Sequence, residues 1–142
     1  SASEPLAAGQ TLLVEAADTV TSAPELVRLT LNLAMTHTDA TRSVYGKRLV
    51  YGGHTISIAS KQLAMGLPHI LQILAWYCCD HVCPVFEGDV LSSQITIKET
   101  QKVQDATVAK LAVEVFAKRG PEAPSDLPDA KVLDWSLAAL LP

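Results

Sequence analysis

The feature that most constrains this chain is the apolar segment 53–65, which lies between helix-breaking residues. Gly52 and Gly53 open it, and Gly66 and Pro68 close it. Glycine suits the left-handed cap position of a helix, and proline cannot continue one. Apolar residues fall on nearly every side of the predicted helix, and such a helix is usually buried. The sequence therefore predicts a central helix that the rest of the chain wraps.

The remaining segments favour strands, because they are rich in aliphatic and β-branched residues or alternate between apolar and polar. The predicted strands are 10–20, 70–82, 90–99, 107–117 and 131–140. The run 70–82 is apolar almost throughout, which predicts a strand buried on both faces. Segments 90–99 and 107–117 form a long hairpin in this interpretation, although alanine and lysine leave a helical alternative for 107–117. The last segment is a strand or a tail that packs through Leu133, Trp135 and Leu137.

A short helix is predicted after the first strand. Ser22 is a plausible N-cap, and Glu25 follows three residues later as in a capping box. Leu26, Leu29 and Leu33 then share one face at helical spacing. Three irregular connections complete the chain, namely the loop 38–50, the turn 84–89 and the proline-rich loop 118–129.

Composition limits the class of protein. The chain has 142 residues, of which 49% are hydrophobic, so we expect a single domain over 1–142. A net charge of -4 argues against a nucleic-acid partner. No apolar run reaches the ~18 residues that span a membrane. The first ten residues lack the basic and apolar regions of a signal peptide, which favours a cytoplasmic protein.

The three cysteines, Cys78, Cys79 and Cys83, are a poor disulfide framework, because they are odd in number and clustered. Reduced thiols are the simpler interpretation. Cys79, His81 and Cys83 would share one face of a strand, but the second ligand pair of a zinc site is missing. We therefore expect no metal.

Three stretches carry a resemblance to a known family. Residues 32–37 read Asn-Leu-Ala-Met-Thr-His, residues 49–54 read Leu-Val-Tyr-Gly-Gly-His, and residues 84–91 read Pro-Val-Phe-Glu-Gly-Asp-Val-Leu. Together they resemble the signature of the MaoC-like (R)-specific enoyl-CoA hydratases. That signature is Asp-x-Asn-Pro-x-His, then a His-Gly that opens the central helix, then a Pro-Val-x-x-Gly-Asp-x-Leu turn.

The resemblance covers about residues 10–117 and implies the α+β hot-dog fold, an antiparallel sheet wrapped around one long central helix. The string Tyr-Gly-Gly-His also looks like the branch that includes mesaconyl-CoA hydratases and their double-hot-dog relatives. The family's catalytic Asp falls on Asn32, its Asn on Ala34 and its Pro on Met35, whereas His37 is retained.

The implied activity is the addition of water to an enoyl-CoA thioester without a further cofactor. His37 is the expected base, because its ordinary pKa lies near working pH. Asn32 cannot exchange a proton, but an amide can orient the water. The N–H groups of Gly52 and Gly53 are expected to hold the thioester oxygen, because a helix start leaves donors unpaired and partly positive.

Other residues have both a functional and a structural interpretation. Asp39 and His54 are candidate helpers of His37, or else a turn cap and a partly buried histidine. The basic residues Arg42, Lys47 and Arg48 are candidate contacts for CoA phosphates, or else a solvated surface. His69 and His81 are expected to be surface or strand histidines, and Trp76 and Tyr77 are expected to lie in the core or at a dimer surface.

Three functions remain open. The first is a hydratase that forms a homodimer with its sheets joined edge to edge, because an exposed sheet edge tends to pair. The second is a non-catalytic hot-dog subunit that binds acyl-CoA or completes a heterodimer with another hot-dog chain, which Asn32 favours. The third is a thioesterase, which the lack of a carboxylate in 53–65 disfavours.

Overall fold

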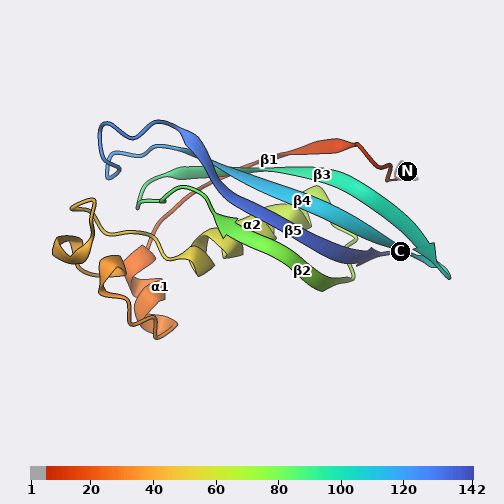
Figure 1. Ribbon diagram of the computed structural model, residues 1–142, viewed down its shortest axis with the longest axis horizontal. Helices are drawn as coiled ribbons and strands as arrows, with labels where there is room; N and C mark the ends of the chain where they lie inside the picture. Colours follow the sequence, from red (N-terminus) through yellow and green to blue (C-terminus); the bar gives the residue numbers. More distant parts are fainter. Residues whose placement is uncertain (1–5) are drawn as a thin grey trace.

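The computed structural model describes residues 6–142, which form one antiparallel sheet and a central helix (Figure 1). The strands are β1 (Thr11–Thr19), β2 (Gln72–His81), β3 (Val90–Val103), β4 (Ala106–Lys118) and β5 (Ala130–Leu141). The helices are α1 (Ala23–Leu29) and α2 (Gly52–Gly66), with two 3-10 turns, η1 (Met35–His37) and η2 (Ala40–Arg42). The strand order is β1-β3-β4-β5-β2, and every neighbouring pair is antiparallel. The α+β hot-dog fold is thereby confirmed.

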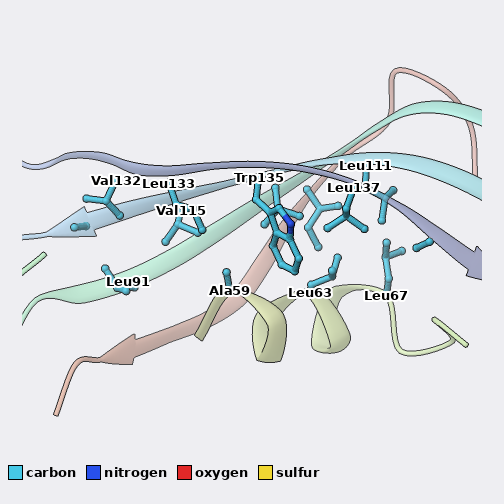
Figure 2. Close-up of a cluster of buried hydrophobic side chains, with 14 of the residues drawn as sticks. Ala59, Leu63, Leu67, Leu91, Leu111, Val115, Val132, Leu133, Trp135 and Leu137 are labelled. Carbon is cyan, nitrogen blue, oxygen red and sulfur yellow. The ribbon is translucent and has the colours of Figure 1, made fainter. Parts of the chain in front are cut away.

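The core lies between α2 and the sheet. Ala59, Leu63 and Leu67 face the sheet, and Trp135 of β5 points down toward the helix (Figure 2). Trp135 is only 1% exposed, and Leu137 is fully buried beside it. Burying a side chain of this kind stabilises a fold by about 1.5–3 kcal/mol. This confirms that the last segment is a strand that packs through its apolar residues.

The structure corrects the expectation that the central helix is buried on all sides. Thr55, Ala59, Gln62 and Leu63 are its buried residues, whereas Met65 is 54% exposed. The physical reason is that one sheet covers only one face of a helix. Ile56 and Ile58 are partly buried against the core, so Met65 is the large apolar residue of α2 that is left exposed within residues 6–142.

The prediction of a strand buried on both faces at 70–82 is wrong. The strand there, β2, pairs with β5 alone among the described strands and forms an edge of the sheet. Leu74, Trp76 and Tyr77 are 47%, 52% and 59% exposed. An apolar run indicates that both faces of a strand are suited to burial. The strand order decides whether residues of the same domain bury them.

The start of α1 also differs from the prediction. Ser22 has a φ of 57° and its side chain makes no capping hydrogen bond. Instead, the N–H of Ala23 donates to the carboxylate of Glu87 at 3.0 Å. The helix ends at Leu29, which is 81% exposed, and Leu33 is 89% exposed, so the expected apolar face is not buried.

The hairpin and the turn that precedes it are confirmed. Segment 107–117 is strand β4, paired along its length with β3, which excludes the helical alternative. In the turn 84–89, Gly88 has a φ of 87°, which favours glycine. Asp89 is fully buried and accepts a hydrogen bond from Arg119 at 2.8 Å and one from the N–H of Gly120. This ion pair ties the turn to the proline-rich loop.

A buried polar network fixes α2 on the sheet. The side-chain amide of Gln62 donates to Asp18 of β1 at 2.8 Å and to the Leu91 carbonyl of β3 at 2.9 Å. Its oxygen accepts from the hydroxyl of Ser93. Within residues 6–142, no helix is long and apolar enough to cross a membrane.

Candidate active site

His37 lies in the turn η1, before the start of α2 and outside the sheet (Figure 1). Its Nδ1 lies 2.8 Å from the carbonyl oxygen of Leu49. Because a carbonyl oxygen only accepts, Nδ1 carries the proton and the lone pair is on Nε2. Leu49 is itself held by an antiparallel bridge to Phe86 and by a hydrogen bond from its N–H to Thr36. The surrounding backbone therefore orients His37 with Nε2 able to accept a proton.

The start of α2 offers open hydrogen-bond donors. Within residues 6–142, the N–H groups of Gly52 and Gly53 donate to no side chain and no carbonyl. The preceding Tyr51 is extended, with φ −75° and ψ 147°, and its side chain does not cap the helix. Such unpaired donors, with the positive end of the helix dipole, suit an oxygen that develops negative charge.

Two aromatic rings explain why both positions are glycine. Neither glycine has a positive φ, so backbone conformation does not require them. A Cβ on Gly52 would lie 2.5 Å from Nε2 of His81, and one on Gly53 would overlap the hydroxyl of Tyr51. The positions that a side chain at either glycine would occupy are therefore taken by His81 and Tyr51.

Tyr51 and His81 are residues of this site that sequence reasoning missed. The ring of Tyr51 also meets His37 edge to face, with centroids 6.1 Å apart. The position of Tyr51 directly before the double glycine was a usable signal. His81 carried no such signal, because its proximity to Gly52 is a tertiary contact between segments far apart in sequence.

Asn32 is engaged locally. Its side-chain oxygen accepts a hydrogen bond from the N–H of Ala34 at 3.0 Å. Within the described part of the chain, no hydrogen bond joins Asn32 to His37. One lone pair of the oxygen and the amide NH2 group stay available, so the role of Asn32 in orienting water stays a prediction.

The two candidate helpers, Asp39 and His54, differ in their hydrogen bonding. Asp39 accepts from the N–H and the hydroxyl of Thr41 at 2.9 and 2.7 Å, which lowers the pKa of its carboxyl and makes it a cap of η2. Its structural interpretation therefore holds. His54 is partly buried, and its Nδ1 has no hydrogen-bond partner among residues 6–142. Burial lowers the pKa of His54, partly opposed by the charge of Glu87, so this imidazole is neutral near pH 7.

The basic residues lie on the surface. Arg42 and Arg48 are exposed, and Lys47 lies 4.0 Å from the carboxylate of Glu122. Two hollows of about 890 and 580 Å³ lie elsewhere, one beside Leu67 at the end of α2 and one on the outer face of the sheet beside Tyr77. His37 lines neither hollow.

A single sheet wrapped over one long helix, with an oriented histidine and open N–H groups at the start of that helix, defines a hot-dog domain with a candidate active site. No protein-family model matches the chain. Comparison with known proteins identifies the family.

The chain is 35% identical over 96 residues to mesaconyl-CoA hydratase from Cereibacter sphaeroides, covering 67% of this chain and 28% of the relative. It is 30% identical over 107 residues to beta-methylmalyl-CoA dehydratase from Chloroflexus aurantiacus, covering 69% and 30%. Among solved structures, a double hot-dog protein of Mycobacterium tuberculosis described as a conserved hypothetical protein is 46% identical. That match has a TM-score of 0.80 and covers 94% of this chain and 38% of the other.

The chain belongs to the MaoC-like hot-dog family. It spans about a third of the length of the curated relatives that it matches. The expected resemblance is confirmed, including the branch that contains mesaconyl-CoA hydratase.

Proposed function

We propose that this domain adds water across the double bond of an enoyl-CoA thioester, or catalyses the reverse dehydration. The observation that carries the proposal is the hydrogen bond from Nδ1 of His37 to the Leu49 carbonyl, which leaves Nε2 as a base close to the open helix start. The names of the two curated relatives, a CoA hydratase and a CoA dehydratase, support the same chemistry.

The proposed reaction needs one base that also serves as acid. Nε2 of His37 takes a proton from water while the water oxygen bonds to the β-carbon of the substrate. The π electrons move to the thioester oxygen, which the N–H groups of Gly52 and Gly53 stabilise. His37 then returns the proton to the α-carbon, so the atoms of one water are added and His37 is regenerated.

Loss of either part of this proposed site has an expected effect on the reaction rate. Removing one donor to a developing oxyanion costs about 2.7–4 kcal/mol of barrier. Losing a general acid or base costs roughly 10²–10⁴ in rate. In the proposal Asn32 orients the water through its free amide protons. Arg42, Lys47 and Arg48 neutralise the CoA phosphates, which their exposure on the loop 38–50 permits.

A second hot-dog domain is the proposed partner. Strand β2 offers an unpaired edge, and both β2 and the outer face of α2 expose apolar residues. A second copy of this chain, or another hot-dog chain, would cover both surfaces at once. The partner would also add walls to the active site.

A non-catalytic subunit is the competing function, and the observation that favours it is the local use of Asn32. At residue 32, where the family signature has a carboxylate, the chain has an amide that accepts a hydrogen bond from the N–H of Ala34. A thioesterase is disfavoured, because α2 carries no carboxylate from Gly52 to Gly66.

The test is the loss of the conjugated enoyl-thioester absorbance, measured with short, long and branched dicarboxylic enoyl-CoAs. We expect turnover that disappears in His37→Ala and persists in His69→Ala, which changes a histidine beyond the far end of α2. Turnover that survives in His37→Ala would remove this mechanism. No turnover on any substrate, with activity restored in Asn32→Asp, would support the non-catalytic subunit.

A further inference from the structure

Three of the four histidines of this chain gather around the start of α2, although they come from three separate segments. His37 lies in η1, His54 in the first turn of α2 and His81 at the end of β2. The proposed function uses only His37. His81 differs from His54 in two respects: it is the more exposed of the two, and its ring lies where a side chain on Gly52 would point.

The distance between His81 and Gly52 allows both to bind the same oxygen. Nε2 of His81 lies 2.5 Å from the position that a Cβ on Gly52 would take. Because N and Cβ of one residue are about 2.5 Å apart, Nε2 lies within about 5 Å of the Gly52 nitrogen. One oxygen accepts two N–H···O bonds of about 2.9 Å each, and so bridges donors up to roughly 5.8 Å apart.

The surroundings of His81 keep its ring neutral. Partial burial lowers its pKa, and the neighbouring Asp80 on β2 opposes this only in part. Burial also lowers the pKa of His54, in the first turn of α2, and the charge of Glu87 opposes this in part. A neutral imidazole at a helix start is a known device for polarising a carbonyl, since it donates a hydrogen bond without giving up its proton.

We propose that His81 is a third donor for the thioester oxygen, giving a hydrogen bond from Nε2–H beside the N–H groups of Gly52 and Gly53. The inference rests on the hydration proposed above and adds a catalytic residue to it. No proton leaves His81, which is neutral before and after the reaction. Its contribution is to stabilise the negative charge that reaches the oxygen when water bonds to the β-carbon.

This assignment gives the glycine at position 52 a function. Any side chain at this position would meet the His81 ring and push it from the helix start. The assignment also fits a site in which Asn32 replaces the catalytic Asp of the family signature. A better stabilised enolate forms with a weaker base.

The first experiment compares His81→Ala and His81→Gln with the wild type in the enoyl-CoA assay. We expect kcat to fall about 10²–10³-fold in His81→Ala, with KM nearly unchanged, because the donor acts on charge that develops in the transition state. His81→Gln keeps an N–H donor and is expected to recover part of the loss. His69→Ala is the matched control and is expected to keep the wild-type kcat.

The second experiment has a readout that a merely structural role would not change. A saturated acyl-CoA with a ¹³C-labelled thioester carbonyl is bound to each variant, and the carbonyl stretch is measured by infrared difference spectroscopy. We expect a shift to lower frequency in the wild type, a smaller shift in His81→Ala and an intermediate one in His81→Gln. Thermal unfolding of each variant confirms that it is folded.

The outcomes separate this inference from the proposed function. A wild type that is active, with His37→Ala inactive and His81→Ala at wild-type kcat, would overturn the role of His81 alone. An equal shift of the carbonyl frequency in the wild type and in His81→Ala would also overturn the role of His81 alone. A wild type without hydration of any substrate would overturn the proposed function and, with it, the catalytic role of His81.

Discussion

At the scale of single residues, the site depends on how a few polar groups are already committed. His37 donates a hydrogen bond from its Nδ1–H to the carbonyl of Leu49, so only Nε2 carries a lone pair that can accept a proton. Asn32 gives one lone pair to Ala34 and keeps its amide protons. The proposed hydration would use these two groups, a histidine oriented by a backbone carbonyl and an amide where the family signature has a carboxylate.

The change Asn32→Asp tests whether the amide at residue 32 limits the rate of the proposed hydration. A carboxylate accepts the hydrogen bond from Ala34 as the amide does, so the backbone is expected to keep its path. It also supplies a second base, and we expect kcat for hydration to rise by roughly 10²-fold. Steady-state rates of Asn32→Asp and Asn32→Ala are compared, the latter losing the local hydrogen bond without gaining a base. A kcat that is the same in Asn32→Asp and wild type would contradict the role assigned to residue 32.

At the scale of elements, buried polar contacts place the site. The turn 84–89 carries the backbone that holds Leu49 and Val50, and hence both His37 and the start of α2. Asp89 fixes this turn, because its carboxylate receives hydrogen bonds from Phe86, Arg119 and Gly120. The other end of the proline-rich loop is tied by Arg119 to Pro128 and Asp129.

Removing the buried carboxylate is expected to destabilise the domain strongly. In Asp89→Ala the guanidinium of Arg119, whose side chain is 8% exposed, loses its ion pair inside the protein. Breaking a buried pair from one side costs about 3–5 kcal/mol. Urea unfolding measures the loss, and the exposed Asp126→Ala in the same loop is the control. A cost below about 1 kcal/mol in Asp89→Ala would mean that this pair does not anchor the loop.

The contact between α2 and β1 is expected to weaken in acid. Hydrogen bonds from Lys61 and Gln62 lower the pKa of Asp18 from its ordinary value of 3.8. A carboxyl whose pKa is lowered on folding stabilises the protein above the unfolded pKa, and this contribution disappears as pH falls through the folded pKa. The free energy of unfolding in urea is measured at pH 7 and pH 3. We expect a smaller decrease in Asp18→Asn than in the wild type, and equal decreases would show that Asp18 contributes nothing.

At the scale of the whole molecule, one side of the domain is left uncovered. Leu74, Trp76 and Tyr77 of the edge strand β2 are exposed, and so is Met65 near the end of α2. Apolar surface of this extent next to a free strand edge is typical of an interface. This explains why the sequence of β2 reads as a strand buried on both faces. Its apolar residues are suited to burial, but residues 6–142 do not bury them.

A charge placed on this edge is expected to prevent association. Light scattering should give the wild type twice the 15.2 kDa of one chain and Leu74→Lys the mass of one chain. Leu13→Lys is the matched control, because Leu13 is also exposed on an edge strand, β1. A wild type of single mass would rule out the second copy and leave a different hot-dog chain as the partner. A dimer that persists in Leu74→Lys would place the interface elsewhere.

The sequence by itself determined the elements of this protein. Helix α2, the β3–β4 hairpin and the turn at Gly88 follow from patterns within a few residues, because glycine, proline and apolar periodicity act locally. The same local patterns allowed the family to be recognised, and they located His37 and the helix start. The cap at Ser22 failed although it is local, because Glu87 from a distant turn supplies the acceptor.

Only the tertiary structure decided which surfaces meet. Strand order placed β2 at an edge, and a single sheet covered one face of α2, neither of which a pattern along the chain contains. The tertiary fold brought His81 at the end of β2 next to Gly52, a residue far away in sequence. Contacts of this kind depend on how separate elements pack, so the candidate site could be located from the sequence but completed only from the fold.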